Sequence, residues 1–157
     1  MDQLFSVPDT AFLTHVASRL GVAALLGGLI GIEREWMGKA AGLRTHMTVA
    51  LGCAAFMLVA IASSTDQGNT SRAIQGIAAG IGFIGAGTIL KRGDIEDIKG
   101  LTTAATIWLT AAVGAAAGAG QGWVGFVAVA IAFLILSIFS GIDRWLARKR
   151  GDAPGPE

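Results

Sequence analysis

Residues 100–142 read GLTTAATIWLTAAVGAAAGAGQGWVGFVAVAIAFLILSIFSGI and contain no charged side chain. As a single helix, at about 1.5 Å per residue, this segment would extend about 65 Å, roughly twice the hydrocarbon thickness of a bilayer. It must therefore fold back on itself. We expect the turn at residues 118–122, where Gly118, Gly120 and Gly122 permit a tight reversal and Trp123 suits the membrane interface. The segment thus predicts two transmembrane helices, over about residues 101–117 and 123–142.

Three further charge-free runs lie upstream, at residues 20–32, 47–65 and 73–90. A crossing helix needs about 20 mostly apolar residues, so the helix of the first run must begin near Phe12 and carry His15 and Arg19 into the membrane. For Arg19 we weigh functional pairing against snorkelling to the outer surface, and favour snorkelling because His15 would share its wet face. We predict an all-α, polytopic bundle of five transmembrane helices, over about residues 12–32, 47–65, 73–90, 101–117 and 123–142.

The composition favours a membrane bundle over a soluble domain. Hydrophobic residues make up 53% of the chain and charged residues 15%, with 23 glycines and a mean hydropathy of +0.62. The net charge of +1 gives no general attraction to nucleic acid. The single cysteine, Cys53, leaves no disulfide framework or zinc site within one chain. The lipid bilayer is therefore an expected partner, and nucleic acid is not.

The basic residues predict an orientation. All but two of the 12 Lys and Arg residues fall in three segments: the connections after helices one and three, and the C-terminal tail. The exceptions are Arg19 and Arg72. Because basic loops stay in the cytosol, we expect the N-terminus outside and the C-terminus in the cytosol. Residues 1–146 would form the transmembrane domain, and residues 147–157 a disordered cytosolic tail.

Helices two and four open with related corners, GLRT at residues 42–45 and GLTT at residues 100–103. Each corner follows a glycine-rich helix and a charged loop, which suggests a parallel repeat of two helical hairpins. The alternative is that any Gly-, Ala- and Thr-rich helix after a basic loop looks alike. A true repeat would place the two corners symmetrically about one site.

Residues 80–85, GIGFIG, match the glycine fingerprint of dinucleotide-binding proteins. We reject that reading, because neither a strand-turn-helix context nor a water-exposed loop accompanies the match. Small residues spaced four apart instead let helix backbones approach closely in lipid. We therefore expect a helix-packing role for Gly27, Gly31, Gly76, Gly80, Gly82, Gly85, Gly87, Gly114 and Gly118.

The most distinctive stretch is GIEREWMGKAAGLRTH, residues 31–46, which places many ionisable groups at a membrane edge. Glu33 could pair with Arg44, accept from threonine hydroxyls or bind a hard cation, and Arg44 could equally bind a lipid phosphate. Glu33 and Glu35 are the metal-ligand candidates, with Mg²⁺ the cation considered and no other cofactor expected. The alternative is a solvated loop that only sets orientation. The candidates for binding a ligand or partner are Glu33, Arg34, Glu35, Arg44, Thr45, His46, Thr102 and Thr103.

Thr102, Thr106 and Thr110 form a hydroxyl stripe along the predicted fourth helix. Such stripes usually bond helices together, and a permeation path is the alternative. The cores of helices two to five carry no acidic residue, which weakens the case for an ion pump. We expect Trp108 to fill a packing gap. Because no catalytic motif occurs, we expect no enzyme and assign no catalytic residue.

Four blocks in order, at residues 31–35, 41–46, 80–87 and 100–108, resemble the MgtC/SapB family of bacterial inner-membrane proteins. The resemblance covers about residues 27–120. It implies a multi-pass protein of the inner (plasma) membrane, linked to growth at low magnesium and to survival inside macrophages during virulence. Some members carry a cytosolic ACT-like domain, and we expect this chain to be a short form without it. The virulence members are thought to bind the membrane sector of ATP synthase, which makes that sector an expected partner.

Three functions follow as hypotheses. The leading one is a non-enzymatic membrane regulator that contacts partner proteins or a second copy of itself. The second is a small Mg²⁺ transporter or channel subunit with Glu33 at its inner mouth. The third is a cytosolic cation sensor built on Glu33, Glu35 and the cluster of Asp94, Glu96 and Asp97.

Overall fold

The computed structural model describes the backbone of residues 9–63, 67–91 and 98–150. Five helices account for most of this part: α1 (Thr10–Trp36), α2 (Leu43–Ala62), α3 (Gln67–Gly87), α4 (Leu101–Gly118) and α5 (Gly122–Arg150). Between α3 and α4 the two-residue strands β1 (Leu90–Lys91) and β2 (Ile98–Lys99) pair antiparallel, with Leu90 opposite Lys99. The expected helical bundle is confirmed, and the short strand pair is an addition to it.

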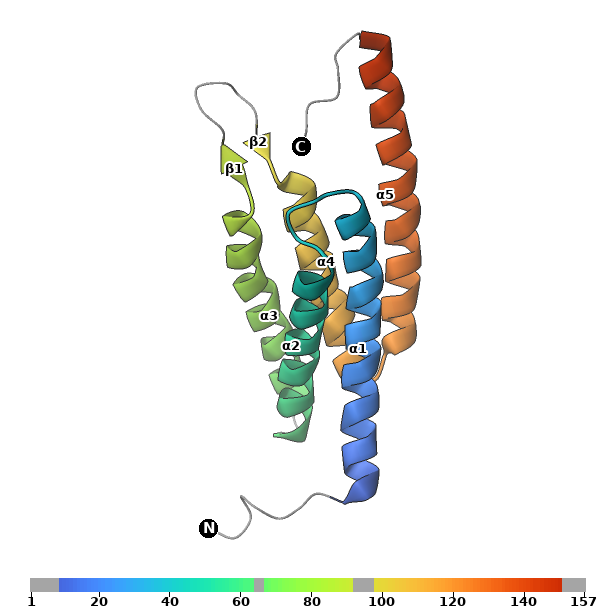
Figure 1. The fold of residues 1–157 in the computed structure, drawn as a ribbon. Helices are drawn as coiled ribbons and strands as arrows, with labels where there is room; N and C mark the ends of the chain where they lie inside the picture. The colour runs from blue at the N-terminus through green and yellow to red at the C-terminus, as the bar shows by residue number, and fades with distance from the viewer. Residues whose placement is uncertain (1–8, 64–66, 92–97, 151–157) are drawn as a thin grey trace.

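The helices run alternately in opposite directions along one bundle (Figure 1). The α1–α2 connection, the strand pair and the end of α5 lie at one end, and the α4–α5 turn lies at the other. α4 contacts all of the other helices, and α2 packs against both α1 and α4. This arrangement brings the end of α1 next to the beginnings of α2 and α4.

The predicted reversal between the last two helices is present. α4 ends at Gly118, α5 begins at Gly122, and Gly120 between them has a φ of 81°. This left-handed conformation favours glycine, because a Cβ would clash with the following carbonyl. α5 continues to Arg150, so residues 147–150 of the expected disordered tail are helical, and residues 151–157 lie outside the described residues.

Within the part of the chain that the structure describes, three helices, α1, α2 and α4, are long and apolar enough to cross a membrane. The apolar part of α5 within the described side chains, Gly122–Ile138, is shorter. α3 begins with QGNTSR, and these polar side chains lower its hydropathy at that end. The five expected spans thus correspond to five observed helices, and within the described residues α1, α2 and α4 reach the length and hydropathy of a crossing helix.

Small residues hold α2 between its neighbours. Ala50 and Ala54 of α2 form one buried cluster with Ala23 of α1 and Ala117 of α4. Because these side chains end at Cβ, the helix main chains approach closely and gain dispersion contacts. In lipid, such packing stabilises helix association.

Trp108 was expected to fill a packing gap, and that expectation is wrong. Its side chain is 53% exposed. Thr103, Thr106 and Thr110, at three- and four-residue spacing, share the buried face of α4. Trp108 projects from a different face of the same helix, because its position falls outside that spacing.

Candidate functional site

Buried polar side chains from α1, α2 and α4 converge where α1 ends and the other two helices begin. We call Glu33, Arg34, His46, Thr103 and Thr106 the polar junction; each is at most 5% exposed. Burial of such groups is costly unless they are hydrogen-bonded, so their partners decide what the junction does. Four of them, all except Thr106, are candidates from the sequence.

Arg34 links α1 to α4. Its Nη2 donates to Thr103 Oγ1 at 3.3 Å, and this hydrogen bond joins residues far apart in the sequence. Arg34 Nε is buried and has no partner among the described residues. An arginine that is 2% exposed at the end of an apolar helix is thus held by one interhelical hydrogen bond and keeps one unused donor.

His46 links α2 to α4. Its Nδ1 lies 2.9 Å from the Gly42 carbonyl oxygen, which can only accept, so the ring proton belongs on Nδ1. Nε2 then faces Thr106 Oγ1 at 3.4 Å as an acceptor. The Thr106 hydroxyl has one proton and lies closer, at 3.0 Å, to the Thr103 carbonyl oxygen. The contact between His46 and Thr106 is therefore the weaker of the two.

The hydroxyl stripe of α4 is mostly satisfied within its own helix. Thr110 Oγ1 donates to the Thr106 carbonyl oxygen at 2.8 Å, and Thr106 Oγ1 donates to that of Thr103. Thr102, at the start of the stripe, is exposed. Such bonds to the preceding turn let hydroxyls sit inside an apolar bundle without lining a passage.

The two glutamates of α1 have different surroundings. Glu35 Oε2 accepts the Leu43 main-chain N–H at 2.8 Å, so its carboxylate satisfies one of the unpaired amides at the beginning of α2. Glu33 is buried, and its Oε2 has no partner in the part of the chain that the structure describes. Glu33 therefore carries an unused acceptor on the helix that also carries the unused Arg34 donor.

The remaining candidates lie at the rim of the junction. Arg44 is exposed and Thr45 is half-buried. The pairing of Glu33 with Arg44, one of the possibilities considered for Glu33, is not formed between these described residues, because Glu33 is buried and Arg44 is exposed.

The described residues form no cluster that supports the metal-site hypothesis. Within the described residues, no three His, Cys, Asp or Glu side chains come together in a way that could hold a metal ion. Glu35 is bound to the main chain of α2 rather than free for a cation. The proposed sensor residues Asp94, Glu96 and Asp97 lie outside the described residues.

Two glycines of α1 lie at close contact with α2. A Cβ added at Gly27 would lie 2.6 Å from the His46 carbonyl oxygen, and one added at Gly31 would lie 2.6 Å from Leu43 Cα. Both contacts are with main chain, which cannot move aside cheaply. These glycines set the distance at which His46 and Leu43 stand from the end of α1.

Two glycines of α4 likewise lie at close contact with the main chain of α2. A Cβ at Gly114 would collide with the main chain of Ala50, and one at Gly118 would lie 2.5 Å from the Ala54 carbonyl oxygen. α2 is therefore held between glycine-lined faces of two helices.

The expected packing glycines of α3 differ from those of α1 and α4. A Cβ at Gly85 would meet Ala104 at 3.7 Å, an ordinary contact. α3 packs on the bundle through the face that includes Gly85 and the buried Ile81, one turn apart. An added Cβ would meet nothing within 4 Å in the described chain at Gly76, Gly80, Gly82 and Gly87.

Arg19 has a specific partner that the sequence did not reveal. Its Nη1 donates to the Gly118 carbonyl oxygen at 3.0 Å, across α1 and the end of α4. The last carbonyls of a helix lack partners within the helix and carry partial negative charge, so a guanidinium is well suited to them. The half-buried Arg19 thus pairs with the end of α4, whereas the sequence favoured snorkelling to the outer surface.

Comparison with known proteins places the chain in a family. The model of the MgtC family matches residues 20–145. The chain is 43% identical to SrpB of Synechococcus elongatus, over 82% of this chain and 78% of SrpB. It is 48% identical to MgtC of Brucella abortus, over 78% of this chain and 50% of that protein.

A further relative, from Escherichia coli, is named the putative magnesium transporter YhiD and is 43% identical over 83% of this chain and 63% of YhiD. The chain thus spans about half the length of the Brucella relative and less than two thirds of the Escherichia coli one. No solved structure matches. The family model and the relatives, which agree over most of the sequence, show that this chain belongs to the MgtC family.

Proposed function

We propose that this chain is a non-enzymatic regulatory protein of the bacterial inner membrane, which serves adaptation to low magnesium or host stress through contacts with other membrane proteins. The construction of the polar junction supports this. Its buried members join α1, α2 and α4. Exposed residues of distinctive chemistry, Trp36, Arg44 and Thr102, lie within two residues of these members along the chain and form what we call the rim of the junction. A partner that contacts this exposed rim would act directly on the point where three helices meet.

Transport of Mg²⁺ is the competing function, and the printed name of the Escherichia coli relative favours it. The charges near Glu33 favour regulation instead. Glu33 is followed directly by the buried Arg34, so a cation brought to the Glu33 carboxylate would also meet a guanidinium charge in a medium of low dielectric constant. The hydroxyls of Thr106 and Thr110 donate hydrogen bonds to main-chain carbonyl oxygens of their own helix.

Crosslinking in native membranes tests the regulatory proposal. Trp36→Cys and Thr102→Cys, in a Cys53→Ala background, would carry a photoreactive group at the rim of the junction. Ile131→Cys on α5, 52% exposed, is the matched control away from it. We expect the rim positions to capture one defined membrane protein, and the membrane sector of ATP synthase is the first identity to examine. If the rim and Ile131 capture the same scattered neighbours, the proposal fails.

Ion flux tests the competing function directly. The purified protein in liposomes with a Mg²⁺-sensitive dye inside is expected to show no more uptake than empty liposomes. Mg²⁺ uptake that is lost in Glu33→Gln and kept in Glu35→Gln would favour the transporter, because Glu33, unlike Glu35, keeps a buried carboxylate oxygen without a partner among the described residues.

A further inference from the structure

The beginnings of α2 and α4 follow the same pattern but differ in what binds their free amides. Each helix follows a glycine, Gly42 or Gly100, which has no side chain to act as a cap. At α2, Glu35 Oε2 supplies the missing acceptor by taking the Leu43 N–H at 2.8 Å. At α4, the main-chain N–H groups of residues 101–103 have no partner among the described residues.

The sequence before α4 has no acidic residue that corresponds to Glu35. Glu35 stands seven positions before Gly42, and the residue seven positions before Gly100 is Gly93. A helix N-terminus carries partial positive charge on its unpaired N–H groups, so it favours an anion. The corner that begins α2 contains such an anion within the chain. The matching corner of α4 lacks one in the described part of the chain.

The side chain of Arg34 adds a second donor at the beginning of α4. Its Nη2 donates to Oγ1 of Thr103, the third residue of that helix, at 3.3 Å. In a guanidinium, the N–H of Nε and one N–H of Nη2 lie along the same edge and point the same way, and this edge can hold two oxygens of an anion. Nε is buried and has no partner among the described residues. The unused half of this edge is thus directed toward the first turn of α4.

This point is positively charged and open on one side. Arg34 is 2% exposed, and its described hydrogen bond goes to a neutral hydroxyl, which leaves the charge unpaired there. Glu33 is the neighbouring acid, but successive residues of a helix point about 100° apart, and its Oε2 does not meet Arg34 Nε. Leu101 and Thr102 are exposed, so an anion can reach the amides of α4 from the rim of the junction.

We propose that the beginning of α4 and Arg34 together bind a phosphate group, carried by a phospholipid headgroup or by a free phosphate. The donors come from two elements, because the amides belong to residues 101–103 and the guanidinium belongs to α1. A phosphate presents oxygens in several directions, whereas a carboxylate presents two oxygens in one plane, so a phosphate reaches both sets of donors. The hydrogen bond between Arg34 and Thr103 is longer than the usual range of about 2.7–3.2 Å, so a phosphate can replace it at small cost.

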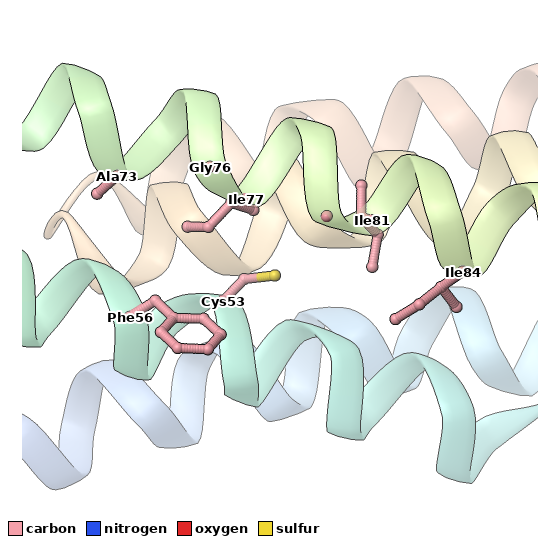
Figure 2. A pocket seen from close by; sticks show the side chains of 8 residues that line it. Cys53, Phe56, Ala73, Gly76, Ile77, Ile81 and Ile84 are labelled. Carbon is pink, nitrogen blue, oxygen red and sulfur yellow. The ribbon is translucent and has the colours of Figure 1, made fainter.

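The apolar groove between α2 and α3 does not compete for the phosphate. Figure 2 shows its lining, which comes from Cys53 and Phe56 of α2 and from one face of α3 between residues 73 and 84. None of these lining side chains is charged, and the Cys53 thiol is the one hydrogen-bonding group among them. Phosphate that binds to the chain is therefore not assigned to this groove.

The phosphate site shares Arg34 and Thr103 with the polar junction, so its use as a regulatory signal rests on the proposed function. Binding itself is measured with no partner protein present. Failure of phosphate binding and failure of partner crosslinking can therefore be told apart.

Titration of the full chain in a non-ionic maltoside detergent tests the site. The ligands are inorganic phosphate and dihexanoyl phosphatidylglycerol, with the ionic strength held constant by chloride. Phosphorus NMR line widths report binding, and a ligand that binds the folded chain also raises its unfolding temperature. We expect saturable binding of at least one of the two ligands. Saturation by inorganic phosphate identifies a free phosphate as sufficient, and saturation by the lipid alone identifies a headgroup.

Two variants with the same change of charge separate a specific site from general attraction. Thr102→Asp places a carboxylate in the first turn of α4, which suits the helix dipole and should keep the fold, but repels a phosphate. Arg44→Gln removes an exposed charge at the beginning of α2, which already has Glu35. We expect Thr102→Asp to weaken binding roughly tenfold or more and Arg44→Gln to change it less than about twofold. Arg34→Met should also weaken binding roughly tenfold or more, because it removes a charge-assisted hydrogen bond.

The unfolding temperature without ligand shows which variants are folded. Arg34→Lys, which keeps the charge and removes the two-donor edge, replaces Arg34→Met if the latter is not. Equal weakening by Thr102→Asp and Arg44→Gln would mean general attraction to this end of the bundle and would overturn the proposal. Absence of binding by both ligands would overturn it too. So would binding that appears only when the three acids of residues 94–97 are changed to their amides, because a carboxylate of the chain would then occupy the helix start.

Discussion

At the scale of the residue, Glu35 has a structural role, because its carboxylate caps the beginning of α2. Its carboxylate reaches the Leu43 amide because Gly42 has no side chain; a Cβ there would lie 2.8 Å from Glu35 Oε2. A side-chain oxygen at a helix N-terminus typically contributes about 1 kcal/mol. We expect Glu35→Ala to lose about 1 kcal/mol of unfolding free energy in detergent. Glu35→Gln keeps an acceptor oxygen and should lose less; equal losses would contradict the capping role.

Arg19 allows a second prediction at this scale. Its hydrogen bond to the Gly118 carbonyl joins α1 to the end of α4, and hydrogen bonds of charged groups contribute about 1.5–3 kcal/mol. Arg19→Met keeps most of the aliphatic length and removes the donor, so the unfolding free energy should fall by about that amount. Arg44→Met, at an exposed arginine, is the control and should change little. If both variants unfold alike, Arg19 only snorkels.

The sequence identified several junction residues but not their partners. Glu33, Arg34, His46 and Thr103 could be singled out because ionisable and hydroxyl groups beside apolar runs must be either exposed or bonded. Which groups meet depends on the rotation of each helix, which the pattern of apolar residues leaves open. The pairing of Glu33 with Arg44 was therefore one of several possibilities, and it is absent between these two described residues.

At the scale of the element, the surroundings of two glycines predict that Gly→Ala substitutions change the unfolding free energy in opposite directions. Gly27→Ala places a Cβ 2.6 Å from the His46 carbonyl oxygen, and such overpacking costs about 1–3 kcal/mol. Gly52→Ala, on α2 with nothing within 4 Å, should instead stabilise by up to about 1 kcal/mol through helix propensity. Unfolding of both purified variants in one detergent measures the difference. A Gly27→Ala variant that is as stable as the unchanged protein would mean that this glycine does not set the helix spacing.

The two helical hairpins share a contact at matching positions. Gly27 of α1 faces the main chain of His46, and Gly85 of α3 faces the main chain of Ala104, at the same separation along the sequence. The corners before α2 and α4 also lie at the same end of the bundle (Figure 1). Gly27 is in tight contact and Gly85 in ordinary contact, so the second hairpin is the looser one. The repeat stays a prediction, now with one pair of equivalent contacts to support it.

The sequence predicted which segments form helices better than it predicted what surrounds each helix. The turn around Gly120 followed from length, because one helix over residues 100–142 would be too long for a membrane, and from the glycines that mark its place. The open glycines of α3 did not follow, because small residues four apart look the same whether or not a neighbour covers them. The strand pair β1–β2 was also missed, since two-residue strands leave no periodic pattern.

At the scale of the whole molecule, the ends of the bundle differ in charge. Arg34, Lys39 and Arg44 belong to the end where α1 meets α2, and Lys91 and Lys99 belong to the strand pair at the same end. The opposite end, with the α4–α5 turn, contains Gly120 and Gln121 and no basic residue in that turn. The positive-inside rule then predicts that the polar junction faces the cytosol.

Accessibility to a membrane-impermeant thiol reagent checks this orientation. In the Cys53→Ala background, Thr102→Cys lies at the junction end and Gln121→Cys lies in the α4–α5 turn, and both positions are exposed. We expect Gln121→Cys to react in intact cells after removal of the outer membrane. Thr102→Cys should react only after the inner membrane is opened, because basic segments resist translocation. Reaction of both from one side would mean that α4 does not cross, although its length and hydropathy permit it. Reversed accessibility would place the junction outside and exclude a cytosolic partner at its rim.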